Sequence, residues 1–397
     1  MPAIQLTSYT MTSALGAGLD ATWQALRDRR SGLARRAWET VDLDTCIGEV
    51  HGLDDLRVPP PLQAFDCRNN RLAWWALQQD GFESAVQAAV ARHGAQRIGV
   101  FLGTSTSGIL SSEQAYRERD AQGRLPAWLD YRHTHNTFSV ADFVRQHFAL
   151  QGPAFVVSTA CSSSAKVFAN AQRLMRAGLI DAAVVGGVDS LCLTTLYGFT
   201  SLQLVSPAPC RPFDADRNGI SIGEAAGFAL LEWAAAPSDD AIVLSGVGES
   251  SDGHHMSAPH PEGLGARLAM QGALQAAGLT PADVGYITLH GTSTPANDAA
   301  EDKAVAALFG PGGVPCSSLK GHTGHTLGAA GIVNAVVGAL ALRHGLAPAG
   351  VGTRQIDPAL SAHYLLDNLP LPLRHVLGNS FGFGGSNCSV LLSRGAA

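Results

Sequence analysis

The sequence contains little charge and very little lysine. Only 15% of its 397 residues are Asp, Glu, Lys or Arg, and the formal net charge is -6. Lysine occurs only as Lys166, Lys303 and Lys320. An acidic balance gives no support for binding nucleic acid or an anionic membrane surface. We therefore predict no nucleic-acid partner and no membrane partner.

The sequence also lacks the cysteine spacings of a disulfide or zinc framework. The seven cysteines form no C-x-x-C pair, and they lie at Cys46, Cys67, Cys161, Cys192, Cys210, Cys316 and Cys388. Unpaired spacing of this kind is typical of a reducing compartment, and we predict no bound metal. The start Met1-Pro2-Ala3-Ile4-Gln5 lacks the features of a signal peptide, and the most apolar stretch, Leu327 to Leu342, is interrupted by Gly and Asn334. The interpretation is a cytoplasmic protein.

Hydrophobic content of 46% and 44 glycines are typical of a buried α/β protein with tight turns between strands and helices. Short β-branched runs alternate with amphipathic helical runs, which predicts sheets covered by helices. The predicted strands are Ile98 to Leu102, Phe155 to Val157, Ala182 to Val185, Gly227 to Glu232, Ala241 to Gly246, Val284 to Leu289 and Ser389 to Leu392.

A small, polar, proline-containing segment at 234–240 is the best candidate boundary between two halves. We place the N-terminal half at 1–236 and the C-terminal half at 237–397. A strand, a turn with a reactive side chain and a helix follow one another in Val156 to Arg176 and again in Ile287 to Phe309. This repetition suggests a duplication, although α/β proteins often repeat such units.

Cys161 lies where the apolar run Phe155 to Val157 ends and the helical pattern Ala165 to Arg176 begins. A thiol at a helix N-terminus meets unpaired backbone N–H groups and the positive end of the helix dipole. Both favour the thiolate, so we predict a lowered thiol pKa and a nucleophilic role for Cys161.

Four segments together resemble the β-ketoacyl-acyl-carrier-protein synthases, the decarboxylating condensing enzymes of the thiolase superfamily. They occur in the family's order and approximate spacing along essentially the whole chain. The segments are the Cys161 turn, His290 to Asp298 with Glu301, Leu319 to Gly331, and Asn379 to Asn387. The resemblance implies a thiolase-like fold, five layers αβαβα built from two similar halves.

The resemblance further implies an acyltransferase that forms a 3-oxoacyl-carrier protein by decarboxylative Claisen condensation, in fatty acid, polyketide or aryl polyene synthesis. Cys161 would carry the acyl chain, while His290 and His325 would stabilise the enolate formed when malonyl-carrier protein loses CO2. Lys320 and Glu301 would form a buried pair that orients His325. No cofactor is implied.

Other residues receive substrate roles from the same resemblance. The backbone N–H groups of Cys161 and Phe383 would form the oxyanion hole, and Phe383 would gate the pocket. The residues implied to contact substrate are Phe383, Phe381, Thr292, Thr294, Thr106 and Asn387. His322 departs from the family pattern and receives no role.

The implied partners are an acidic acyl carrier protein and a second subunit, either an identical copy or a related one. Arg68 and Arg71 are our candidates for carrier docking, since lysine is scarce. A shortened segment at 202–211 favours a specialised pathway such as that of aryl polyenes. Two alternatives stay open: a non-catalytic chain-length subunit, which would lack the nucleophilic cysteine, and a coenzyme A thiolase, which would need a second, basic cysteine.

Overall fold

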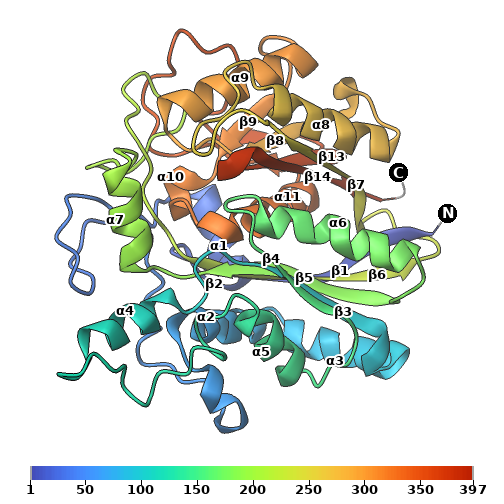
Figure 1. Ribbon diagram of the computed structural model, residues 1–397. Coiled ribbons are helices and arrows are strands. Elements are labelled where there is room, and N and C mark those ends of the chain that lie inside the picture. The colour runs from blue at the N-terminus through green and yellow to red at the C-terminus, as the bar shows by residue number, and fades with distance from the viewer. Residues whose placement is uncertain (1, 396–397) are drawn as a thin grey trace.

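The computed structural model describes residues 2–395, which fold into five layers (Figure 1). Helices α2, α3 and α5 cover one sheet on the outside, α8 and α9 cover the other, and α6 and α11 lie between the two sheets. The predicted αβαβα thiolase-like architecture is confirmed. The longer helices are α1 (Gly18–Arg27), α2 (Arg68–Leu77), α3 (Phe82–His93), α4 (Ile109–Arg117), α5 (Ser139–His147), α6 (Ser163–Arg176), α7 (Leu193–Ser201), α8 (Leu264–Ala277), α9 (Pro295–Phe309) and α11 (Ala330–His344). Short helical turns include α10 (Lys320–Thr323), η4 (Leu327–Ala329) and η5 (Phe383–Gly385).

Each half contributes five strands in the same spatial order. The N-terminal half reads β1-β6-β5-β3-β4 and the C-terminal half reads β7-β14-β13-β8-β9, with two antiparallel pairings followed by two parallel ones. The halves join where Gln5 of β1 pairs with Val243 of β7. These strands are β1 (Ala3–Ser13), β3 (Ile98–Gly103), β4 (Ala154–Val157), β5 (Ala182–Asp189), β6 (Ala225–Ala234), β7 (Ile242–Ser251), β8 (Tyr286–Leu289), β9 (Pro315–Ser318), β13 (His375–Gly382) and β14 (Ser386–Arg394). The minor strands are β2 (Gly16–Ala17), β10 (Leu346–Ala347), β11 (His363–Tyr364) and β12 (Leu369–Pro370).

The duplication is therefore present, but the two segments compared in the sequence are not equivalents. The strand order matches β4 and α6 with β9 and α11. The segment Ile287 to Phe309 contains β8 and α9 instead. The counterpart of β8 in the first half is β3. Because β4 and β9 hold matching places, the turn after β4 and the turn after β9 face one another at the centre of the molecule.

Helix α11 forms the core of the central layer, and its residues from Ala330 to Leu342 are all buried. The window Leu327–His344 is long and apolar enough to cross a membrane, but 89% of it is buried inside this fold. Its apolar character is explained by contact with both sheets, as expected of a core helix in a soluble protein.

Candidate active site

Cys161 lies in the turn between β4 and α6, two residues before the helix begins. The residue before it, Ala160, has φ +51°, a left-handed conformation that costs a non-glycine residue about 1 kcal/mol. This bend points the Cys161 side chain away from the sheet and into a buried pocket. The predicted strand, nucleophile turn and helix are therefore confirmed.

Helices α6 and α11 are in close contact, which brings together the turns that precede them. A Cβ added to Gly331 of α11 would lie 2.3 Å from the backbone nitrogen of Ala165 in α6. Only glycine permits this approach. As a consequence, the Cys161 turn before α6 lies against His325, which precedes α11.

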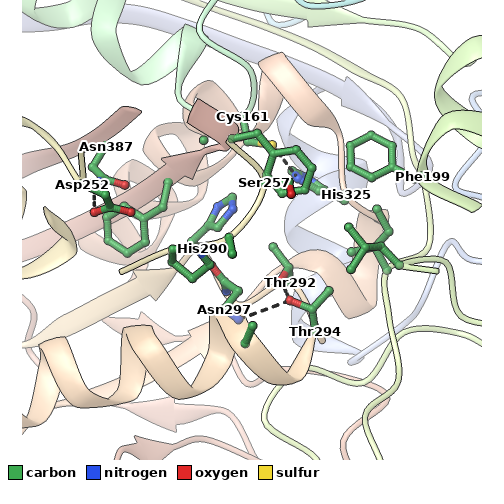
Figure 2. A pocket seen from close by; sticks show the side chains of 18 residues that line it. Cys161, Phe199, Asp252, Ser257, His290, Thr292, Thr294, Asn297, His325 and Asn387 are labelled. Atoms are coloured by element: carbon green, nitrogen blue, oxygen red, sulfur yellow. Dashed lines mark hydrogen bonds between the residues drawn. The ribbon is translucent and has the colours of Figure 1, made fainter. Parts of the chain in front are cut away.

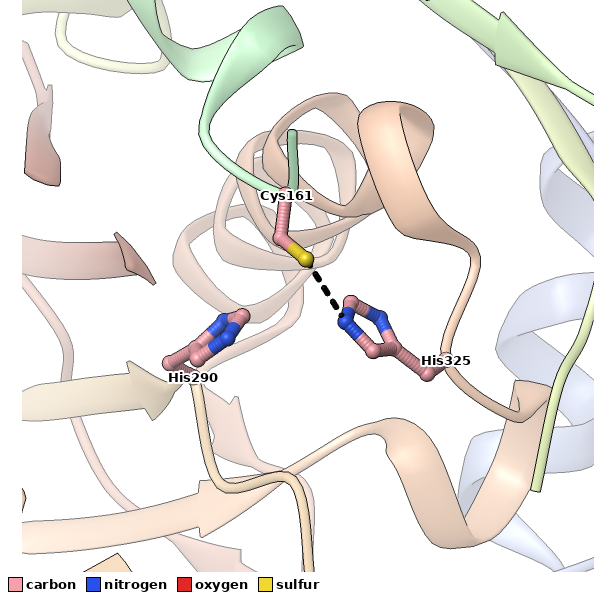
Figure 3. A group of neighbouring side chains, drawn as sticks. All are labelled: Cys161, His290 and His325. Carbon is pink, nitrogen blue, oxygen red and sulfur yellow. Dashed lines mark hydrogen bonds between the residues drawn. The ribbon is translucent and has the colours of Figure 1, made fainter. Parts of the chain in front are cut away.

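His325 contacts the sulfur directly, with Nε2 2.9 Å from Sγ of Cys161 (Figure 3). On the other side of the ring, the backbone N–H of Leu327 donates to Nδ1 at 3.3 Å. A ring nitrogen that accepts cannot carry the hydrogen, so the hydrogen of the neutral ring lies on Nε2. His325 therefore presents an N–H donor to the pocket.

His290 ends β8 and reaches the same point from the opposite half. Its ring lies 5.4 Å from that of His325, nearly perpendicular to it. Lys320 Nζ lies 3.4 Å from Nδ1 of His290 and also donates to the backbone carbonyl of His290. Because the ammonium group can only donate, Nδ1 accepts, and Nε2 of His290 carries the hydrogen.

Glu301 supports His290 through the backbone. Its carboxylate accepts the N–H groups of His290 at 2.8 Å and of Gly291 at 2.7 Å, and the amide of Asn379 at 3.1 Å. The prediction that Lys320 and Glu301 pair directly and orient His325 is wrong. Among the described residues no ion pair joins them, and both hold His290 from different sides.

Both histidines are neutral at physiological pH. Burial lowers the pKa of His290 and of His325 well below its ordinary value, and the nearby charge of Lys320 acts in the same direction. The pKa of Lys320 is itself lowered by burial. Both rings are therefore neutral imidazoles whose Nε2–H groups face the pocket.

The expectation of a lowered thiol pKa for Cys161 is corrected by its surroundings. Only 5% of Cys161 is exposed, and burial raises its thiol pKa to about 12. Lys320 and the backbone N–H groups of Cys161 and Phe383 act against that rise. These two N–H groups therefore lie near the sulfur, where an oxyanion hole is needed next to a nucleophile.

A pocket opens above these side chains and contains most of the predicted substrate residues (Figure 2). Phe381, Phe383, Thr292, Thr294 and Asn387 all line it. The hydroxyls of Thr292 and Thr294 lie 2.9 Å apart, and Asn387 donates to Asp252.

Several lining residues were not predicted from the sequence. The Phe199 ring, from α7, lies 5.6 Å from that of Phe383, and Asp252 follows β7 and donates its N–H to Gly385. The remainder of this group is Leu204, Ile220, Ser257, Ala258, Pro259, Ala296 and Asn297. The polar run Asp252 to Ser257 directly after an apolar strand was a usable signal, whereas nothing in the helix pattern around Phe199 pointed to a pocket.

Three predicted residues lie outside this site. Arg68 is not available for docking, because it is 5% exposed and its guanidinium binds the buried carboxylate of Glu224. Arg71 is partly buried and paired through two hydrogen bonds with Asp66. Thr106 is buried and donates its hydroxyl to Asp189 instead of lining the pocket.

Two family models match the chain in succession. The model of the β-ketoacyl synthase N-terminal domain covers residues 1–236, and that of the C-terminal domain covers residues 241–354. A 3-oxoacyl-[acyl-carrier-protein] synthase 2 from Vibrio cholerae is 30% identical over 98% of this chain and 99% of its own length. A mitochondrial 3-oxoacyl-[acyl-carrier-protein] synthase from Arabidopsis thaliana is 37% identical over 63% of this chain and 58% of its own.

Solved structures give the same result for the fold. A ketosynthase from Xenorhabdus doucetiae, determined in complex with its chain length factor, is 41% identical with a TM-score of 0.91, covering 99% of this chain and 98% of that one. A β-ketoacyl synthase from Burkholderia phymatum is 26% identical with a TM-score of 0.88, covering both chains fully.

Proposed function

This chain belongs to the β-ketoacyl synthase family, and from that premise we propose that it is a 3-oxoacyl-acyl-carrier-protein synthase. The observation that carries the proposal is the convergence of Cys161, His290 and His325 on one point of a buried pocket. A nucleophile, two N–H donors and a pair of backbone N–H groups are the parts that a two-stage acyl condensation requires.

In the first stage, the sulfur of Cys161 attacks the thioester of an acyl carrier protein. The oxygen of the tetrahedral intermediate is held by the backbone N–H groups of Cys161 and Phe383, and the carrier thiol leaves with the proton of Cys161. The product is an acyl-Cys161 thioester. Donors placed in advance toward such an oxyanion are commonly worth about 2.7 to 4 kcal/mol each.

In the second stage, malonyl-carrier protein enters the same pocket. The Nε2–H groups of His290 and His325 donate to its thioester carbonyl, so that the electrons left by departing CO2 are stabilised as an enolate. The enolate carbon then attacks the acyl-Cys161 carbonyl and displaces the Cys161 thiolate, which gives the 3-oxoacyl-carrier protein. Lys320 and Glu301 act on this step by positioning His290.

The two alternatives fit the site less well. A non-catalytic chain-length subunit has no use for the intact Cys161 and its two histidines. A coenzyme A thiolase needs a second cysteine in the pocket, yet Cys388 is completely buried in β14 and, among the described residues, Cys161 is the one cysteine that lines the pocket.

We also propose that the enzyme pairs with a second subunit through the edge strand β4. This strand pairs only with β3 in the described chain, and its Phe155 is 48% exposed. An open edge with an exposed aromatic side chain is a surface that proteins usually cover. The likeness to a ketosynthase in complex with its chain length factor favours a related subunit over an identical copy.

The proposed reaction is tested by following both stages in one purified system. The enzyme is supplied with acyl-carrier protein and with malonyl-carrier protein that is labelled at the carbon of its free carboxyl group. The release of labelled CO2 is measured together with the 3-oxoacyl product. We expect CO2 and product in equal amounts, and loss of both in His290→Ala. Equal condensation in that variant would contradict the proposal. A panel of saturated and polyunsaturated acyl chains identifies the pathway.

A further inference from the structure

The three converging side chains are also a ligand set for zinc. Cys161 Sγ and one ring nitrogen from each of His290 and His325 lie within 4.8 Å of one another, and all three residues are buried. Thiolate and imidazole are ligands that Zn²⁺ prefers, and three protein ligands with an open fourth position define its catalytic sites. We propose that the unacylated enzyme binds one Zn²⁺ at Cys161, His290 and His325, and that this ion reversibly blocks acylation.

The geometry requires only side-chain adjustment. Ligand atoms of a tetrahedral zinc site lie about 3.4 Å apart, given zinc bonds of about 2.0 to 2.3 Å. The Cys161 and His325 atoms are already 2.9 Å apart, and both rings lie on the same side of Cys161 (Figure 3). The cavity above them, about 70 Å³, has room for the ion and a water molecule as fourth ligand.

The protons balance without any further reactant. Zn²⁺ displaces the proton of the Cys161 thiol, which leaves to solvent as a zinc–thiolate bond forms. Each imidazole stays neutral, because its ring hydrogen moves from Nε2 to Nδ1 by exchange with water. In His325 this move breaks the hydrogen bond that the Leu327 N–H donates to Nδ1, which lowers the affinity for zinc. Binding therefore releases at least one proton and strengthens about tenfold for each unit of rising pH.

Lys320 limits the affinity. Its ammonium group lies 3.4 Å from Nδ1 of His290, where it repels a dication and competes with the ring hydrogen that zinc binding places there. The zinc site is for this reason reversible, and it exists only while Cys161 is free, since a thioester sulfur is a poor ligand. Zinc and the acyl chain exclude one another.

Cobalt substitution tests the site without relying on turnover. The full chain is titrated with Co²⁺, and we expect one equivalent to produce a sulfur-to-cobalt charge-transfer band together with the intense visible bands of four-coordinate Co²⁺. Added Zn²⁺ should abolish both. The bands should be absent in Cys161→Ser and retained in Cys67→Ser, a matched control that removes another buried thiol. Circular dichroism confirms that each variant is folded.

Other outcomes are decisive. His325→Ala should keep the thiolate but bind Co²⁺ at least tenfold more weakly, and Lys320→Met should bind it more tightly. A wild-type spectrum without the charge-transfer band, or a band that survives in Cys161→Ser, overturns the proposal. The exposed His254 and the half-buried His260, with ring centres 5.2 Å apart, can bind Co²⁺ but give no thiolate band.

The inhibitory part of the inference rests on the proposed function, whereas the metal spectrum does not. Acylation of Cys161, followed by protein mass with and without Zn²⁺, separates the two. We expect Zn²⁺ to lower the rate of acylation in proportion to the fraction of enzyme molecules that carry the metal. If acylation proceeds and no cobalt band forms, the zinc site is wrong and the enzyme assignment stands. If the cobalt band forms and no acylation occurs, the zinc site stands and the enzyme assignment is wrong.

Discussion

Two neutral imidazoles, each with its hydrogen on Nε2, are the central feature of the site at the scale of residues. Leu327 fixes this state for His325 through a backbone N–H, and Lys320 fixes it for His290. Burial keeps both rings uncharged. Two donors of the same kind thus face one carbonyl position, which is the requirement for stabilising an enolate.

The lowered pKa values of His290 and His325 predict how stability depends on pH. In the unfolded chain a histidine titrates near pH 6.5, and in the folded enzyme both remain neutral well below that value. Their contribution to the free energy of unfolding is therefore complete above about pH 6.5 and is lost as pH falls further, by up to about 2.7 kcal/mol per pH unit for two groups. Denaturant titrations at pH 7.5, 6.5 and 5.5 measure this slope. A His290→Gln, His325→Gln double variant should show a smaller slope, and an unchanged slope would disprove the assignment.

Replacing Lys320 tests its positioning role. Lys320→Met keeps the side-chain volume but removes the donor to Nδ1 of His290, so the Nε2 hydrogen is no longer fixed. We expect CO2 release to fall about 100-fold to 1000-fold, the effect of one misplaced donor, while acylation of Cys161 falls less. Lys303→Met, which removes a half-exposed lysine paired with Glu262, is the control and should behave as wild type. Equal loss of both stages in Lys320→Met would mean that the lysine only supports the fold.

At the level of single residues, the sequence identified the reacting side chains. It did not predict which contacts the charged residues around them make. Cys161 and His290 each follow a strand, His325 lies in a glycine-flanked turn before α11, and the family motif marks all three. By contrast, Lys320 and Glu301 were expected to meet each other, and Arg68 was expected at the surface. Their contacts join residues up to 156 positions apart, and one-dimensional spacing does not determine which buried partner a charged group meets.

At the scale of elements, the site depends on glycines where backbones touch. A Cβ on Gly382 would lie 2.6 Å from the carbonyl oxygen of Thr159, in the turn that leads to Cys161. The end of β13 and the nucleophile turn are thereby held together, and the Phe383 N–H that follows Gly382 lies near the sulfur.

This contact makes Gly382→Ala a direct probe of the oxyanion hole. The added methyl group must push the Phe383 N–H away from the sulfur, so we expect acylation of Cys161 to slow about 100-fold to 1000-fold. Gly198→Ala, in α7, provides the matched control, because no atom lies within 4 Å of its added Cβ apart from its chain neighbours and the backbone of α7 itself. That control should acylate normally and, as a helical alanine, gain up to about 1 kcal/mol of stability. The rates are measured by quenching the reaction at set times and recording the mass of the intact protein. Normal acylation in Gly382→Ala would refute this geometry.

Seven of the ten main strands were predicted from the sequence as short β-branched or apolar runs, whereas β1, β9 and β13 were not. All eight residues of β5, one of the seven, are buried. The correspondence between the two halves could not be predicted from the sequence, because the order of the strands is set by tertiary pairing. The apparent repeat in Ile287 to Phe309 was local, whereas the equivalence of β4 with β9 is visible only in the sheet.

At the scale of the whole molecule, the edge strand β4 remains open. Its Phe155 lies at the end of the strand order, where a second subunit can continue or cover the sheet.

Phe155→Asp should therefore weaken the dimer. A buried charge without a partner strongly opposes association, so we expect light scattering to report a monomer where wild type, alone or coexpressed with a related chain-length subunit, gives a dimer. Leu268→Asp, on the outer helix α8 and 44% exposed, is the matched control and should leave the dimer intact. A dimer that persists in Phe155→Asp would place the interface elsewhere.

Acylation of Cys161 is the step on which the proposed reaction depends, and intact-protein mass spectrometry measures it. The enzyme and Cys161→Ala are incubated with a panel of acyl carrier proteins bearing saturated and polyunsaturated chains. We expect a mass increase equal to one acyl group in the wild type, none in Cys161→Ala, and a preferred chain that identifies the substrate. An unmodified wild type with every chain, or an adduct that persists in the variant, would contradict the proposed reaction.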